Sequence, residues 1–180
     1  MNSLYVILPG DVDDTSVPSG GNTYDRRMCD RLADAGLDVH EIAVSGSWPR
    51  PDTEARAVLG HLLSALPTGS AVLLDGLVAC GVPEVVVPQA RRLSVSVLVH
   101  LPLADETGLP PALAAELDAL ERDTLRAVSS VVATSAWAAR RLINHHGLAP
   151  HRVHSVTPGV DPAPLAVGTD GVSRLVCVAN

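Results

Sequence analysis

The sequence has very few aromatic side chains. It contains no Phe, and its only Tyr and Trp residues are Tyr5, Tyr24, Trp48 and Trp137. Hydrophobic residues nevertheless make up 47% of the 180 positions, and most of them are Ala, Val or Leu. An aliphatic core of this kind is typical of parallel strands that helices cover on both faces. A chain of this length buries roughly 70% of its unfolded surface, which suits one ordinary domain without disulfides.

Lysine is also absent, since all thirteen basic residues are Arg. A phosphate-binding P-loop is therefore excluded, because its motif requires Lys before Ser or Thr. The dinucleotide-binding pattern G-x-G-x-x-G is missing after the first apolar segment as well. The formal net charge is −7, whereas a nucleic-acid interface needs a basic stripe. We therefore expect no nucleic-acid partner.

Cysteine is sparse and its spacing is irregular. Cys29, Cys80 and Cys177 lie far apart and form no C-x-x-C pair, which favours reduced thiols over a disulfide framework or a zinc site. The seven histidines are scattered, apart from the adjacent pair His145 and His146. Neighbouring side chains on a helix diverge by about 100°, so this pair is not expected to share a metal. We expect no metal site and no cofactor.

Long hydrophobic runs are missing too. No run reaches the length of about 20 residues that crosses a membrane. The first residues lead directly into an apolar segment, without the basic region of a secretory leader. These features predict a cytoplasmic protein and are compatible with peripheral association with a membrane.

What the sequence does contain is a regular alternation of apolar and amphipathic segments. No two apolar segments are joined by a hairpin-length turn, which favours right-handed crossovers and a mostly parallel sheet. We therefore predict an α/β fold with an open, Rossmann-like sheet and helices on both faces. The predicted strands cover residues 4–8, 39–44, 71–74, 94–99, 130–133 and 153–157. The predicted helices cover residues 22–35, 51–66, 83–91, 112–127 and 136–146.

Capping residues and apolar spacing define the first and last of these helices. Asn22 is the predicted N-cap of the first helix, and Tyr24 and Met28 belong to its predicted apolar face. Ser135 is the predicted N-cap of the last helix, and Gly147 is predicted to end it.

The last stretch of the chain differs in composition from the rest. Residues 162–171 are rich in Pro, Gly and Ala, as in a linker, and an apolar segment follows at Leu175–Val178. We expect residues 1–161 to form one domain. We expect residues 162–180 to be a linker and the first strand of a second domain. A final edge strand of the same sheet is the alternative for the apolar segment.

Candidate site residues follow the predicted strands, because open parallel sheets bind ligands at the carboxyl ends of their strands. Gly20, Gly21 and Asn22 form a glycine-rich entry to the first helix, whose N-terminal N–H groups favour an anion. A simple turn is the alternative for this glycine pair. His100 follows the fourth predicted strand, and its ring can donate a hydrogen bond to a sugar hydroxyl. A purely structural role is the alternative for this His.

Three further polar residues complete the predicted site. Asp75 ends the third predicted strand, Glu106 lies in the loop after the fourth, and Ser135 follows the fifth. Their oxygen atoms can bind substrate hydroxyls, although a solvated Glu106 is an equally simple interpretation. None of these carboxylates is expected to act as a covalent nucleophile.

Five short segments occur in a definite order along the chain: GGNTYD (20–25), LADAGLDVH (32–40), VHLPL (99–103), VVATSAWAARRL (131–142) and VTPGVD (156–161). Together they resemble the N-terminal domain of the retaining family 4 glycosyltransferases, which have the GT-B fold. The similarity spans nearly the whole chain. Its most specific part is the serine–helix segment followed by the Pro-Gly-Val-Asp turn.

The resemblance implies roles for several residues. In this family the N-terminal domain carries most of the acceptor site, and its glycine-rich loop, here Gly20 and Gly21, lies near the donor diphosphate. The His after the fourth strand, here His100, lines the donor-sugar site and is the candidate catalytic residue. A C-terminal domain normally supplies the basic residues and carboxylates that bind the nucleotide sugar. The resemblance therefore implies metal-free sugar transfer with retention to an unidentified acceptor, and a fragment that is inactive alone.

Three other functions fit parts of the sequence. A non-catalytic binding module and a nucleotide-sugar epimerase are compatible with the same segments, since both occur on the GT-B fold. A receiver domain also alternates strands and helices, and its acidic residues, here Asp11, Asp13, Asp14 and Asp75, would bind Mg²⁺ and accept a phosphoryl group. The receiver's Lys after the fifth strand has no counterpart here, and 180 residues with six strands exceed its length.

Overall fold

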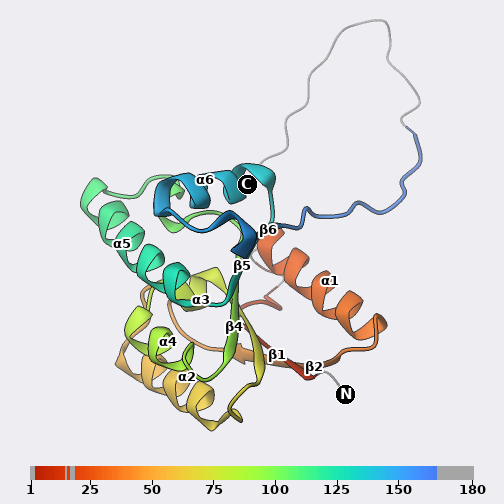
Figure 1. Ribbon diagram of the computed structural model, residues 1–180. Coiled ribbons are helices and arrows are strands. Elements are labelled where there is room, and N and C mark those ends of the chain that lie inside the picture. The colour runs from red at the N-terminus through yellow and green to blue at the C-terminus, as the bar shows by residue number, and fades with distance from the viewer. Residues whose placement is uncertain (1–2, 15, 17–18, 166–180) are drawn as a thin grey trace, which may run out of the picture.

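The protein is built on one parallel β-sheet (Figure 1). The computed structural model describes residues 3–14, 16 and 19–165, so the predicted strand at 175–178 lies outside the described residues. The six strands are parallel throughout and have the order β2-β1-β3-β4-β5-β6, which confirms the predicted open α/β sheet. The strands are β1 (Ser3–Pro9), β2 (Asp38–Val44), β3 (Ala71–Asp75), β4 (Ser94–Val99), β5 (Ser130–Ala133) and β6 (Val153–Ser155).

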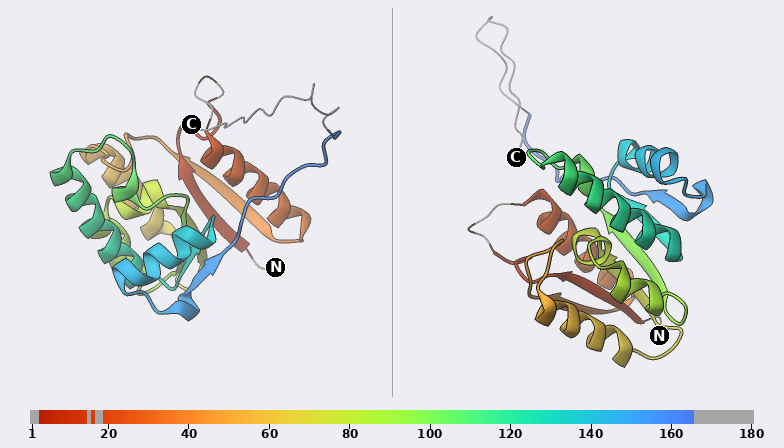
Figure 2. Two further views of the ribbon diagram at one scale, coloured as in Figure 1. Left: turned by 90° about the horizontal axis from the view of Figure 1, so that it is seen from above. Right: turned by 90° about the vertical axis from the view of Figure 1, so that its left-hand side faces the viewer.

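The described helices cover the two faces of the sheet unequally (Figures 1 and 2). On one face α1 packs through Cys29 against Val6, Leu8 and Leu98. The larger core lies on the opposite face, where the other five α-helices pack against alternate residues of the same strands, such as Ile7. The helices are α1 (Gly20–Asp34), α2 (Thr53–Ala65), α3 (Gly76–Cys80), α4 (Pro83–Gln89), α5 (Pro111–Ala127) and α6 (Ala136–His146), with short 3₁₀ turns η1 (Leu103–Asp105) and η2 (Pro150–Arg152).

The direction of the strand connections explains this inequality. The chain passes from β1 through α1 to β2 on one side, and all later connections proceed toward the other side. Right-handed crossovers in opposite directions place their helices on opposite faces of the sheet. The direction therefore reverses between β1 and β3, and such a switch point is where open α/β sheets form a ligand-binding crevice.

The helix boundaries differ from the predicted ones in two instructive places. Ser19, not Asn22, caps α1, since its hydroxyl oxygen accepts a hydrogen bond from the Asn22 N–H. The short helix α3 was not predicted, because it follows β3 directly and Asp75 serves as its cap. The caps of α6 are confirmed: Ser135 accepts a hydrogen bond from the third residue of the helix, and Gly147 ends it with φ of 65°.

None of the helices in the described part of the chain combines the length and the apolar character that crossing a bilayer requires.

Candidate functional site

A cavity of about 240 Å³ lies at the carboxyl edge of the sheet, beside the switch point. The N-terminal turn of α1 forms one wall, the junction of β3 and α3 forms the second, and the loop after β4 forms the third. Five of the seven predicted site residues line this cavity: Gly21, Asn22, Asp75, His100 and Glu106. The topology thus brings together residues that are up to 85 positions apart, because the carboxyl ends of parallel strands share one edge.

His100 and two buried carboxylates form the polar centre of this site. The Nε2 atom of His100 lies 2.9 Å from Oδ1 of Asp25 and 3.5 Å from Oδ2 of Asp75. The two Asp side chains are 1% and 2% exposed, whereas the His100 side chain is 25% exposed. The imidazole is therefore the most accessible of the three groups, whereas Asp25 lies outside the cavity lining and Asp75 contributes to it with an almost completely buried side chain.

The two carboxylates control the protonation of the imidazole. Burial alone would lower the pKa of His100, but the hydrogen bonds and negative charges of Asp25 and Asp75 outweigh it and raise the pKa to about 9. Burial also raises the pKa of Asp25, and the neighbouring charge of Asp75 adds to this, while the hydrogen bond from His100 opposes it. At neutral pH His100 is consequently a cation that donates hydrogen bonds, and it cannot act as a general base.

Contacts around the ring fix its orientation. The Cβ position of Gly21 lies 3.4 Å from Cδ2 of His100, so α1 packs closely against the edge of the ring. The ring of Tyr24 meets it edge-to-face at a centroid distance of 5.4 Å. The hydroxyl group of Thr134 donates a hydrogen bond to the backbone carbonyl of His100 at 3.3 Å. With Nε2 directed at the carboxylates, Nδ1 is the ring nitrogen available to a ligand.

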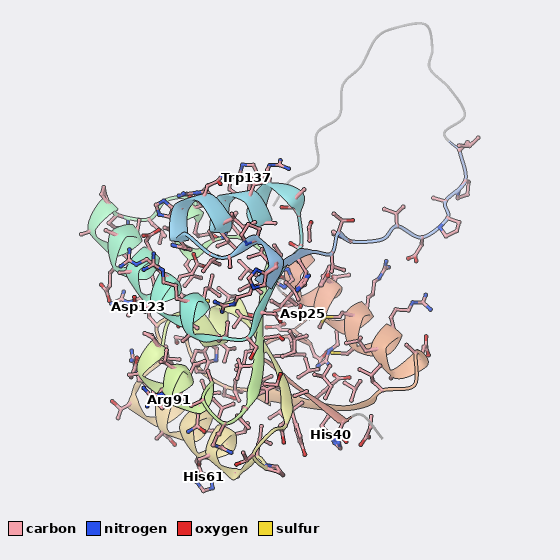
Figure 3. All side chains as sticks on the ribbon, viewed as in Figure 1. Asp25, His40, His61, Arg91, Asp123 and Trp137 are labelled. Carbon is pink, nitrogen blue, oxygen red and sulfur yellow. The ribbon has the colours of Figure 1, made fainter. Side chains whose placement is uncertain are left out.

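Asp25 is the site residue that the sequence analysis missed. It lies on α1 four residues after Gly21 and four before Cys29, so the three share the face that packs on the sheet. The predicted apolar face contained Tyr24 and Met28, which are only half-buried. The signal that could have identified Asp25 is an acidic residue on the buried face of a predicted helix. Figure 3 labels Asp25 between α1 and the sheet.

The two carboxylate oxygens of Asp75 have different partners. Oδ1 accepts a hydrogen bond from the Leu77 N–H at 2.7 Å and so caps α3, while Oδ2 faces His100. Close packing supports this arrangement, because a Cβ atom on Gly76 would lie 2.9 Å from the backbone oxygen of Leu98. The strand end, the helix cap and the charged centre thus depend on one carboxylate.

Two predicted site residues lie outside the cavity. The hydroxyl oxygen of Ser135 caps α6, and its position does not reach the cavity wall. Gly20 lies on the other side of the α1 N-terminus, where it lines a separate shallow groove with Tyr24 and Pro158. Glu106 lines the cavity, and its Oε1 accepts a hydrogen bond from the following N–H at 3.1 Å.

The acidic residues that a receiver domain needs are not assembled. Asp13 pairs with Arg26 at 2.5 Å, and Asp14 accepts hydrogen bonds from the backbone and hydroxyl groups of Ser16. In the described part of the chain, the carboxylate that clusters with Asp75 is Asp25 on α1 rather than one of the loop after β1.

The polar centre could hold a small cation only by giving up its proton. Ligand atoms of Asp25, Asp75 and His100 all lie within 4.8 Å of one another. The same His100 nitrogen faces both carboxylates, however, so a metal ion there would replace the shared proton. A metal ion there would have to compete with the proton that the hydrogen bonds and charges of Asp25 and Asp75 hold on His100, whose pKa is raised to about 9.

Aliphatic side chains form the outer part of the cavity. Leu77 and Leu101 are 42% and 40% exposed at its rim, and Leu103 and Leu109 extend this wall inward. A cation at the base and an apolar rim suit a ligand with both hydroxyl groups and C–H faces, which is the character of a sugar ring.

Comparison of the chain with protein-family models finds no match, and a comparison with curated protein sequences finds none either.

Proposed function

We propose that this chain is the acceptor-side half of a GT-B glycosyltransferase that transfers a sugar from a nucleotide-sugar donor with retention. The observation that supports the proposal most strongly is the position of His100. Its imidazolium lies at the carboxyl end of β4, packs against the N-terminal turn of α1, and is open to the cavity. The resemblance in sequence implies that this residue lines the donor-sugar site.

The charges of the site suit the proposed chemistry. The positive charge that develops on a sugar ring as its diphosphate leaves is stabilised by nearby negative charge. Asp25 and Asp75 together carry up to two negative charges against the one positive charge of His100. The N-terminal turn of α1 faces the same cavity, where its partial positive charge favours the departing diphosphate.

His100 is proposed to orient the sugar rather than to remove a proton. As a cation it donates a hydrogen bond from Nδ1 to a sugar hydroxyl, and its proton on Nε2 remains shared with the carboxylates. Both Asp side chains are almost completely buried, at 1% and 2% exposure, which disfavours covalent attack by either of them. The proposed transfer therefore proceeds without a covalent intermediate on this domain.

The size of the cavity supports a role for this chain as one half of a site. Pockets that enclose a drug-sized ligand have volumes of roughly 300–1,000 Å³, and this cavity is smaller, at about 240 Å³. It has room for a sugar ring but not for a complete nucleotide sugar. The nucleotide is proposed to bind a second domain, as the resemblance implies.

A time course followed by NMR tests this function and its closest alternative together. The purified chain is incubated with a panel of nucleotide sugars and simple glycoside acceptors. We expect neither a glycoside product nor a change in the stereochemistry of the donor, because the nucleotide is proposed to bind a second domain. Transfer by residues 1–180 alone would contradict the proposal, and an epimerised donor would favour a nucleotide-sugar epimerase.

A further inference from the structure

We propose that Asp118, His145 and His146 form a binding site for a divalent metal ion of the zinc type, separate from the cavity. Asp118 lies on α5, and the two histidines are the last residues of α6. Each side chain offers one ligand atom, and the three atoms lie within 4.8 Å of one another. Two imidazoles and a carboxylate are a ligand set that Zn²⁺ prefers.

The adjacent histidines come together despite their divergence on the helix. Their ring centroids are 5.0 Å apart, with an angle of 54° between the planes. The His146 side chain is 2% exposed and points into the protein, whereas that of His145 is 41% exposed and turns back toward α5, where its Nε2 lies 2.6 Å from Oδ1 of Asp118. The two rings therefore lie close together, although the divergence of neighbouring side chains on a helix was the reason for not expecting them to share a metal.

His146 supplies the observation that points to a ligand. Its Nε2 lies 3.0 Å from Oε2 of Glu121, so it donates a hydrogen bond to that carboxylate. In the described part of the chain its Nδ1 is buried and has no hydrogen-bond partner. Buried polar atoms of folded proteins rarely lack a partner. A metal ion bound to Nδ1 would provide one.

Glu121 has the position of the outer carboxylate in many metal sites. A His that binds a metal through one nitrogen usually donates its other N–H to a carboxylate, which fixes the ring and increases its basicity. Glu121 is 1% exposed, and its second oxygen, Oε1, accepts a hydrogen bond from the Leu103 N–H at 3.2 Å. The hydrogen bond to Glu121 thus fixes the orientation of the His146 ring.

The geometry needs only a modest adjustment to bind an ion. Zn²⁺ lies about 2.0–2.2 Å from its nitrogen and oxygen ligands, so tetrahedral ligand atoms are about 3.3 Å apart. Nε2 of His145 and Oδ1 of Asp118, which are 2.6 Å apart, would have to separate to this distance, and the side chains are 41% and 20% exposed. Arg122 lies 3.7 Å from Oδ2 of Asp118, which leaves Oδ1 for the metal.

Binding at this site would have a structural consequence. The metal would join the end of α6 to the middle of α5, and Glu121 would connect both to Leu103, which lines the cavity. We therefore infer that the ion stabilises the packing of α5 and α6 and the wall of the cavity.

Titration of the chelator-treated chain with ZnCl₂ and CoCl₂ tests the proposal. We expect one equivalent of Zn²⁺ to bind, and Co²⁺ to give the absorption of a four- or five-coordinate site. His145→Ala and Asp118→Asn change surface side chains, and each should weaken binding by about tenfold or more. Glu121→Gln should weaken it by about tenfold through the orientation of His146.

Two matched controls exclude other sites. His40→Ala removes an exposed His that also contacts a carboxylate, that of Asp38, far from α6 (Figure 3). His100→Asn removes the imidazole of the cavity. Both variants should bind Zn²⁺ as the unmodified chain does. Unchanged affinity in folded His145→Ala and Asp118→Asn, or loss of binding in His100→Asn, would overturn the proposal.

Discussion

At the scale of single residues, His100 is a partly exposed imidazole whose positive charge is stabilised by two buried carboxylates. Asp25 and Asp75 raise its pKa to about 9, and because it is partly exposed it carries this charge into the cavity. A sugar site that relies on a fixed hydrogen-bond donor gains from this arrangement, since the donor keeps its proton over the physiological pH range.

Titration of the histidine rings by NMR tests this charge state directly. We expect His100 to titrate near pH 9. Asp25→Asn should lower its pKa toward the ordinary value of about 6.5, because the hydrogen bond to Asp25 is the largest effect that raises it. Asp30→Asn, which changes an exposed carboxylate on the same helix, is the matched control. A pKa of His100 near 6.5 in the unmodified chain would contradict the account.

The same shift predicts how stability depends on pH. A His whose pKa is higher in the folded state stabilises the protein fully below pH 6.5, and this contribution is lost as the pH rises through about 9. The loss is on the order of 3 kcal/mol. Urea unfolding at pH 6 and pH 9.5 should show a larger loss of stability in the unmodified chain than in His100→Asn, where the buried thiols of Cys29 and Cys80 still contribute a pH dependence. An equal pH dependence in both proteins would show that His100 is not the group responsible.

The site illustrates what sequence can predict at the residue scale. His100, Asp75 and Gly21 were predictable, because each follows or adjoins the carboxyl end of a strand, and such ends converge in a parallel sheet. Asp25 was not, because its place depends on the rotation of α1 about its axis. A difference of one residue in the inward face decides which side chain of α1 is buried at the sheet, and in the structure Asp25 is buried and hydrogen-bonds His100 while Tyr24 meets the ring edge-to-face.

At the scale of elements, close packing between loops shapes the cavity. Gly81 follows α3, and a Cβ atom there would lie 1.8 Å from the backbone oxygen of Pro49, which lines the cavity. Gly60 lies within α2, and its Cβ position makes an ordinary contact of 3.6 Å with Val85. Substitution by Ala is therefore expected to lower stability at Gly81 but not at Gly60, so the second variant is a control for the first.

Urea unfolding of Gly81→Ala and Gly60→Ala measures the difference. Gly81→Ala should destabilise the protein by more than about 2 kcal/mol, because the backbone of Pro49 has to move. Gly60→Ala should be neutral or stabilise by up to about 1 kcal/mol, since Ala favours the helix. Equal stabilities of the two variants would show that the contact between Gly81 and Pro49 is not tight.

Most elements were predictable from the pattern of apolar residues, and the exceptions have physical reasons. The bounds of β4 and β5 agree with the prediction, because their apolar runs end at polar or loop residues. Helix α3 was missed, because its five residues follow β3 without an intervening turn and are too few to show a helical period. The first helix was predicted to begin at Asn22 because Ser19, its actual cap, precedes two glycines.

At the scale of the whole molecule, the reversal of direction between β1 and β3 decides where a ligand binds. Among the helices that the structure describes, it places α1 alone on one face of the sheet, with its N-terminal turn at the carboxyl edge (Figures 1 and 2). Asp25 on α1, Asp75 after β3 and His100 after β4 meet there. The sequence predicted the parallel sheet, but the strand order, and with it the exact neighbours of His100, needed the structure.

Saturation-transfer NMR of a nucleotide sugar with the unmodified chain and with His100→Asn tests the central claim, that the cavity holds the sugar half of the donor. The account predicts transfer mainly to the protons of the sugar ring, little to those of the nucleobase, and a clear loss of the sugar signals in His100→Asn. Transfer mainly to the nucleobase, or sugar signals that do not change in the variant, would contradict it.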